Sequence, residues 1–202
     1  MAEKPLFIVF EGIDGAGKST QVKLLASRLE ALGTPCIVTA EPSDGPFGRE
    51  IRSMIVRPTP EDEARLFTED RRDHLRSVIL PALHAGVTVI CDRYLYSSVA
   101  YQGARGVSPE RILAENRAFA RDADVTFLLE IPVHEAIRRI GAGRGNSFSV
   151  FEGIGELTAV DAIYRGLEDD RIQRIDGSPP VVVVHDQVMQ ILRRKWCCLD
   201  VT

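Results

Sequence analysis

Residues 12–19 have the spacing G-x-x-x-x-G-K-[ST], which is the pattern of a phosphate-binding loop. Glycine lets the backbone turn tightly, so that several N–H groups can point at one anion. Lys18 adds a positive charge for the β- and γ-phosphates, and the hydroxyl of Ser19 can bind Mg²⁺. The pattern predicts a nucleoside triphosphate site made of Gly12, Asp14, Gly15, Ala16, Gly17, Lys18, Ser19 and Thr20.

Two charged residues, Asp92 and Arg93, follow an apolar run at residues 87–91. In a protein with a phosphate-binding loop, a carboxylate at a strand end can reach Mg²⁺ directly or through water. We therefore expect Ser19 and Asp92 to hold the Mg²⁺ that accompanies the triphosphate. The planar guanidinium of Arg93 suits two-point binding of a phosphate, although an arginine at a strand end can also simply lie on the surface.

The elements that must position these residues are short strands and amphipathic helices in alternation. Five runs are apolar throughout, as parallel strands covered on both faces are; they lie at residues 6–10, 36–39, 87–91, 125–129 and 181–184. Apolar stripes of helical spacing fall between or after these runs, at residues 22–32, 47–55, 75–83, 133–140 and 188–192. The alternation predicts an α/β fold of the P-loop type, a five-stranded parallel sheet with helices on both faces, in a single domain over residues 1–202.

One segment has a different character. Residues 141–147 are rich in glycine and polar residues and lie between two helical stretches. The segment is either a loose connection or part of a lid, at about residues 141–153, that closes over the phosphates and excludes water.

The composition is that of an ordinary globular protein of 202 residues, 45% of them hydrophobic. The net charge of −4 gives no general attraction for nucleic acid, so we expect no such partner. No stretch approaches a membrane span, and no basic segment precedes a long apolar run. The four cysteines follow no disulfide pattern, which favours the reducing cytoplasm.

Four motifs in matching order resemble those of the thymidylate kinase family. Residues 10–20, Phe-Glu-Gly-Ile-Asp-Gly-Ala-Gly-Lys-Ser-Thr, are very similar to the family's phosphate loop. Asp-Arg-Tyr at residues 92–94, followed by Ser-Ser-Val-Ala-Tyr-Gln-Gly at residues 97–103, resembles the second signature of the family. Glu-Pro at residues 41–42 and Leu-Phe-Thr-Glu-Asp-Arg at residues 66–71 resemble a third and a fourth. The resemblance implies that Mg²⁺·ATP and dTMP are converted to ADP and dTDP.

The resemblance also implies which residues bind the thymine base. Phe67 would stack on the ring, as aromatic side chains do on bases, although most phenylalanines are core residues. Arg71, one helical turn further on, would donate to a thymine carbonyl, unless the charged run around it only forms ion pairs on a helix surface. Ser98 and Gln102 would form hydrogen bonds near the base.

Other residues are assigned by the resemblance to the sugar and the acceptor phosphate. Tyr101 would crowd the 2′ side of the sugar and disfavour ribonucleotides. Asp14 would hold the 3′-hydroxyl, and Arg93 would bind the acceptor phosphate. Glu41 and Arg52 would help to order the acceptor and metal side of the cleft.

Phosphoryl transfer depends on positioning the two phosphates and stabilising the negative charge on the transferred group. Some family members carry an arginine inside the phosphate loop for this purpose, whereas this chain has Gly15 there. The arginine must then come from elsewhere, and we expect it to be Arg144, with Arg139 as the alternative. The predicted catalytic set is therefore Lys18, Arg93 and Arg144, in a lid with fewer charges than bacterial-type members usually have.

The alternative function is that of another nucleotide or deoxynucleoside kinase on the same scaffold, in which Glu41 would act as the base. Arg93 favours an acceptor that already bears a phosphate. A GTPase switch is disfavoured because no Asn-Lys-x-Asp element follows residues 125–129. A non-catalytic binding protein is disfavoured by the intact Lys18, Ser19 and Asp92. The resemblance further suggests a homodimer packed through helices, including the stripes at residues 47–55 and 75–83.

Overall fold

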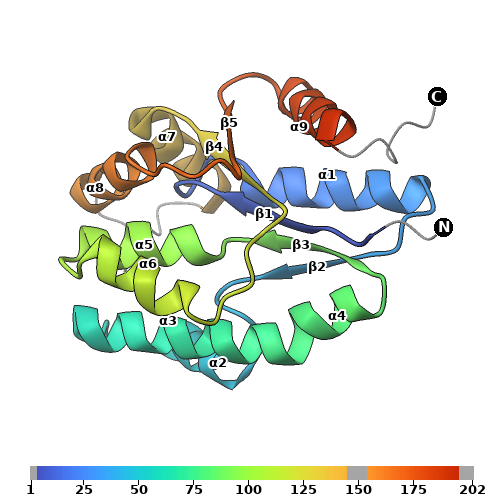
Figure 1. Cartoon of the computed structure of the whole chain (residues 1–202). Coiled ribbons are helices and arrows are strands. Elements are labelled where there is room, and N and C mark those ends of the chain that lie inside the picture. The colour runs from blue at the N-terminus through green and yellow to red at the C-terminus, as the bar shows by residue number, and fades with distance from the viewer. Residues whose placement is uncertain (1–3, 145–153, 196–202) are drawn as a thin grey trace.

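The computed structural model describes residues 4–144 and 154–195 and contains a parallel sheet at its centre (Figure 1). The strand order is β2-β3-β1-β4-β5, and every neighbouring pair is parallel. The strands are β1 (Phe7–Glu11), β2 (Cys36–Ala40), β3 (Thr88–Asp92), β4 (Val125–Glu130) and β5 (Ile172–Asp176). The predicted fold class, a five-stranded parallel sheet of the P-loop type with helices on both faces, is confirmed.

The fifth strand is not the one that the sequence predicted. Residues 181–184 begin helix α9 (Val181–Lys195), in which Val184 N–H donates to Pro180 O at 3.2 Å. Pro180 accounts for the difference, because proline is well suited to a helix start, where no partner for its missing N–H is needed. The true edge strand, β5, mixes apolar and charged residues, since part of it faces solvent.

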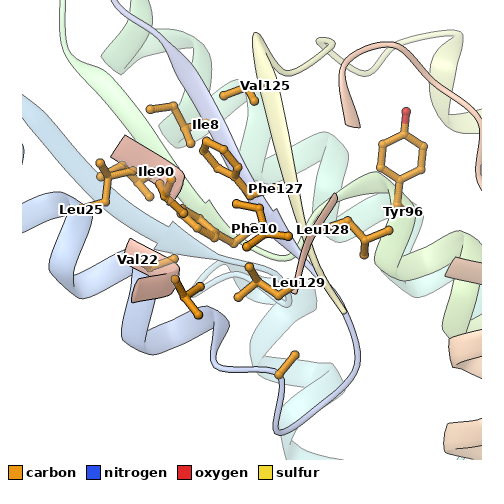
Figure 2. Packing of buried hydrophobic residues seen from close by; sticks show 14 of the residues in the cluster. Ile8, Phe10, Val22, Leu25, Ile90, Tyr96, Val125, Phe127, Leu128 and Leu129 are labelled. Carbon is orange, nitrogen blue, oxygen red and sulfur yellow. The ribbon is translucent and has the colours of Figure 1, made fainter. Parts of the chain in front are cut away.

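The central strand β1 is buried on both faces, which explains its uninterrupted apolar run. Ile8 and Phe10 point into one hydrophobic cluster, while Phe7 and Val9 point into another. All four side chains are at most 1% exposed. Figure 2 shows the first cluster, in which Phe10 and Phe127 from neighbouring strands lie beside α1.

Helices α1 (Lys18–Ala31), α7 (Val133–Arg144), α8 (Ile154–Arg165) and α9 contribute to the first cluster. Helix α1 ends shortly before Gly33, which adopts a left-handed φ of 72°, as glycine often does just after a helix. Helix α7 runs to Arg144, so the start of the predicted glycine-rich segment is helical rather than a loose connection. Burial of Ala136 and Ile140 earlier in the helix favours this, since glycine costs only about 1 kcal/mol per helical position. Residues 145–153, the rest of the predicted lid, lie outside the described residues.

The second cluster is covered by four helices and a π-helical turn, which are α3 (Pro60–His74), η1 (Leu75–Ile79), α4 (Leu80–His84), α5 (Leu95–Ala104) and α6 (Pro109–Arg117). Helix α2 (Pro46–Ser53) packs on α3. Figure 1 shows α3 and α4 on the opposite side of the sheet from α1 and α9. In the π-helical turn Leu80 N–H donates to Leu75 O, five residues back. Pro81 follows directly and has no N–H to donate to Ser77, so the regular α-helical pattern is interrupted here. Leu75 and Ile79 pack on the sheet, so this stripe serves the core. No helix among the described residues is both long and apolar enough to cross a membrane.

Candidate active site

Two cavities meet beyond the carboxyl ends of β1 and β3. The larger, of about 950 Å³, follows the phosphate loop and extends to residues 177–181. The smaller, of about 250 Å³, lies between α2, α3 and α5. Both cavities are lined by the same five residues at their junction, which are Asp14, Glu41, Pro42, Arg52 and Arg93. Two ligands, one in each cavity, would therefore face each other across this group.

The phosphate loop holds Lys18 in a fixed position under the larger cavity. Its Nζ donates to Gly12 O and Ile13 O, each at 2.9 Å, and lies 3.8 Å from Asp14 Oδ1. Burial and the nearby charge of Arg93 lower the pKa of Lys18 to about 8. The ammonium group of Lys18 is thus poorly solvated and lies near the positive charge of Arg93. An anionic ligand would stabilise both cations.

Ser19 and Asp92 lie side by side at the same end of the sheet. Ser19 Oγ donates to Asp92 Oδ2 at 2.5 Å. Asp92 Oδ1 is buried and accepts no hydrogen bond from any described residue. Hard cations such as Mg²⁺ prefer oxygen ligands. The hydroxyl oxygen of Ser19 and the carboxylate oxygen of Asp92 that accepts no hydrogen bond from the described residues are such ligands, so the residues present fit this ion.

Arg93 occupies the junction and is held from several directions. It adopts a φ of 72°, which is uncommon for a residue other than glycine. Its guanidinium forms an ion pair with Asp14, donates to Tyr101 Oη at 3.0 Å and lies 4.6 Å from the centre of that ring. Burial on its own lowers the pKa of Arg93, but Tyr101 and Asp14 raise it well above the usual value, so the side chain is a permanent cation between the cavities.

Arg71 is fully buried in the wall of the smaller cavity, not on a helix surface. Its Nη2 donates to Glu41 Oε2 at 2.6 Å, to Tyr94 O at 2.9 Å and to Ser98 Oγ at 2.9 Å. Its Nη1 donates to Asn116 Oδ1 at 2.7 Å. Only Nε, which is also buried, has no hydrogen-bond partner among the described residues. The Nε–H group is therefore a donor that a ligand could satisfy.

The rest of the smaller cavity combines an aromatic ring with an amide. Phe67, one turn before Arg71 on α3, is half-buried and lines the cavity. Gln102 on α5 is 1% exposed, and its Oε1 accepts no hydrogen bond from the described part of the chain. Ser98 and Tyr101 line the same wall. The structure thus brings together around one cavity the residues that the resemblance assigned to the base and the sugar.

Arg52 and Arg139 line the larger cavity but are engaged elsewhere. Arg52 donates to Pro42 O at 2.6 Å and pairs with Asp44 at 2.9 Å. Arg139 pairs with Glu135 at 2.9 Å and donates to Gly177 O at 3.0 Å. Arg144 ends α7, and its side chain lies outside the described part of the structure. Its assignment as the arginine of the transfer step therefore stays a prediction.

An arginine inside the phosphate loop would not fit this backbone. Gly15 adopts a φ of 82°, and a Cβ built there would lie 2.6 Å from Ala136 O in α7. The loop and α7 would have to separate to admit any side chain at this position. Gly15 is consistent with an arginine that enters the site from another segment.

Sequence reasoning missed a buried carboxylate beneath the site. Glu11, at the end of β1, accepts from Tyr94 N at 3.0 Å, from Ser97 Oγ at 2.5 Å and from Tyr164 Oη at 2.9 Å. Burial raises the pKa of Glu11 in spite of these bonds. By accepting the backbone N–H groups of Tyr94 and Ser97, Glu11 fixes the start of α5 beside Arg93. Glu11 stands inside the motif at residues 10–20, but nothing in the sequence showed which distant groups it would hold.

The parallel sheet, the phosphate loop after its central strand and the second cavity facing that loop define this protein as a P-loop kinase. A sequence model of the family described as "Thymidylate kinase" matches residues 10–188. The chain is 42% identical over 188 residues to the "Thymidylate kinase" of Desulfotalea psychrophila, covering 91% of this chain and 93% of that protein. It is 43% identical over 200 residues to the "Probable thymidylate kinase" of Pyrococcus abyssi, covering 94% of this chain and 96% of that one. The chain belongs to the thymidylate kinase family.

Proposed function

We propose that this protein transfers the γ-phosphoryl group of Mg²⁺·ATP to dTMP, giving ADP and dTDP. The observation that carries the acceptor assignment is a pair of polar atoms without partners among the described residues, Arg71 Nε and Gln102 Oε1, which belong to two residues that line the smaller cavity. The names of the relatives support the same substrate.

The two unused atoms complement the edge of a thymine ring. Arg71 Nε is a donor and suits the O4 carbonyl, while Gln102 Oε1 is an acceptor and suits the N3–H group. Cytosine presents an amino group and an unprotonated N3 at these places. Because an arginine can only donate, Arg71 Nε would face the amino group of cytosine, which is also a donor. A cytosine nucleotide should therefore bind more weakly than a thymine nucleotide.

The other acceptor contacts follow from the shape of the cavity. Phe67 offers a ring face for the base, and Tyr101 stands beside the position proposed for the sugar. Asp14, already paired with Arg93, would accept from the 3′-hydroxyl. Arg93 would bind the acceptor phosphate at the junction, facing the donor triphosphate in the larger cavity.

The transfer step needs position and charge rather than a covalent intermediate. Lys18 and the loop N–H groups from Gly12 to Thr20 would hold the donor phosphates, and Arg144 would stabilise the transferred group. Mg²⁺, held through Ser19 and Asp92, supplies neutralisation of the charge on the donor phosphates when bound. The outer part of the larger cavity, between Arg139 and residues 177–181, has room for the donor nucleoside.

The remaining parts of the proposal concern the setting of the enzyme. It comprises one catalytic domain over residues 1–202, works in the cytoplasm as a homodimer, and has no nucleic acid or membrane partner. The deoxynucleoside kinase alternative is not favoured by the geometry. Glu41, its required base, has one oxygen engaged by Arg71 and the other by His74.

A coupled ADP-release assay tests the proposal, with Mg²⁺·ATP against dTMP, dUMP, dCMP, dGMP, UMP and thymidine. We expect selective turnover of dTMP, with dUMP a poor second. Turnover of thymidine without dTMP would establish the nucleoside kinase alternative. Efficient turnover of dCMP would refute the proposed reading of the base by Arg71 and Gln102.

A further inference from the structure

His74 is a buried residue that lines neither of the two cavities, yet it is bonded to their shared wall. Its Nδ1 lies 3.2 Å from Glu41 Oε1, and its Nε2 lies 2.6 Å from Thr39 Oγ1 on β2. The side chain is buried, with a residue exposure of 1%. A buried imidazole with both nitrogens in hydrogen-bond contact is held in one orientation.

The chemistry of the carboxylate assigns the direction of the bond to Glu41. A carboxylate only accepts, so Nδ1 carries the hydrogen that Glu41 Oε1 receives. The other ring nitrogen, Nε2, is in hydrogen-bond contact with the hydroxyl of Thr39, a group that can both donate and accept. The result is an ordered series of hydrogen bonds from Thr39 through His74 to Glu41.

Glu41 passes this order on to Arg71. Its two oxygens are divided, with Oε1 on His74 and Oε2 on Arg71 Nη2. The tilt of the carboxylate therefore depends on His74, and the plane of the guanidinium depends in part on the carboxylate. Since Nε is the guanidinium nitrogen without a hydrogen bond to the described residues, a rotation of that plane changes where this unpaired N–H points.

We propose that His74 is a positioning residue for the acceptor base, which acts through Glu41 to aim Arg71 Nε into the smaller cavity. The inference rests on the function proposed above, because it gives this N–H a carbonyl to reach. Asp70, one turn before His74 on α3, is occupied by Ser43, which donates to it through its backbone N at 2.8 Å and through Oγ at 2.6 Å. Glu41 is thus the route from His74 to the cavity.

Two amide substitutions separate positioning from general stability. In His74→Asn the amide nitrogen can take the place of Nδ1 and donate to Glu41, whereas in His74→Gln the amide extends toward Thr39. We expect the KM for dTMP to stay within about 3-fold of wild type in His74→Asn and to rise about 10-fold in His74→Gln, since bonds to charged groups are worth about that factor. The KM for ATP should change by less than about 2-fold in both.

A double-mutant cycle with Glu41→Gln tests the route. If His74 acts through Glu41, His74→Gln should raise the KM for dTMP much less in the Glu41→Gln background than in wild type. Thermal denaturation of each variant shows whether a change in the KM for dTMP is accompanied by a loss of stability. Thr39→Val and Thr39→Ser form a second matched pair. Thr39→Val removes the hydroxyl that contacts His74 and should raise the KM for dTMP, whereas Thr39→Ser keeps the hydroxyl and should not.

The outcomes distinguish this inference from the proposed function. If the wild-type enzyme does not turn over dTMP, the proposed function fails first. If it does, equal KM values for dTMP in His74→Asn and His74→Gln, or effects that add fully with Glu41→Gln, overturn the positioning role. Equal rises in the KM for ATP and for dTMP would show a general structural role instead.

Discussion

Ser19 Oγ donates a hydrogen bond of 2.5 Å to Asp92 Oδ2, although the two residues are 73 positions apart in the sequence. One belongs to the first turn of α1 and the other ends β3. The parallel pairing of β1 with β3 brings them together, because both strands end at the same edge of the sheet. The second oxygen of Asp92, buried and without a partner among the described residues, makes this pair the proposed Mg²⁺ site.

Asp92→Asn tests that site through the metal. The amide keeps the shape of the side chain but removes its negative charge, so Mg²⁺ should be held more weakly. We expect the Mg²⁺ concentration at half-maximal turnover to rise at least about 10-fold. A Mg²⁺ titration at saturating dTMP measures this, and an unchanged Mg²⁺ dependence would remove Asp92 from the site.

Phe67→Leu tests stacking on the base. Loss of the ring should raise the KM for dTMP about 5- to 150-fold, because base–aromatic stacking is worth about 1–3 kcal/mol. Phe119→Leu is the matched control, since Phe119 packs against the second hydrophobic cluster and lines neither cavity. Steady-state kinetics should show little change in the KM of the control. Equal effects of the two variants would indicate that Phe67 is only a core residue.

Arg144→Ala and Arg139→Ala should separate into different kinetic effects. We expect Arg144→Ala to lower kcat by about 10³-fold, the usual lower value for an arginine at the transferred phosphate, with little loss of dTMP affinity. Arg139 is held by Glu135 and Gly177 O, so its loss should act mainly on the KM for ATP. Full turnover in Arg144→Ala would exclude it as the arginine of the transfer step.

Gly15→Arg would place an arginine inside the phosphate loop. Because a Cβ at Gly15 meets Ala136 O at 2.6 Å, we expect this variant to lower the melting temperature and to leave Arg144→Ala unrescued. Gly106→Arg is the control, because Gly106 also has a positive φ, of 99°, but a Cβ at this position would meet no described atom within 4 Å. Differential scanning calorimetry compares the two. If Gly15→Arg were as stable as the control variant, α7 would be able to move away from the phosphate loop at little cost in stability.

Asp169→Asn tests an electrostatic contribution to stability far from the site. Burial on its own raises the pKa of Asp169, but hydrogen bonds from Arg171 N and Tyr96 Oη and the charges of Arg171 and Arg117 lower it overall. A lowered pKa in the folded state stabilises the protein at neutral pH, and this contribution is lost as the pH falls through that pKa. Asp169→Asn should therefore cost about 1–3 kcal/mol at pH 7.

The difference in unfolding free energy between wild type and Asp169→Asn should shrink as the pH falls below about 4. Urea denaturation at several pH values measures it. Asp170→Asn, at the exposed neighbouring position, serves as the control and should have little effect at any pH. A difference that is independent of pH would contradict the electrostatic origin.

The sequence by itself determined the phosphate loop, the four strands β1–β4, the helices α1, α2, α7 and α9, and the family. These features depend on residues close together in the sequence: a motif with fixed spacing, apolar runs, and apolar stripes of helical spacing. The same local reasoning failed at residues 181–184, where a run of valines after Pro180 starts a helix. It also missed β5, because an edge strand with one solvated face lacks the apolar run.

Only the tertiary structure decided which atoms of the site remain available. The positions of Glu41, Ser98 and Asn116 engage both terminal nitrogens of Arg71 and leave Nε as the nitrogen without a partner among the described residues. The meeting of the two cavities at Asp14 and Arg93 is likewise set by strand order, which no local pattern encodes. Hydrogen bonds between distant segments follow from packing, and packing is a property of the whole chain.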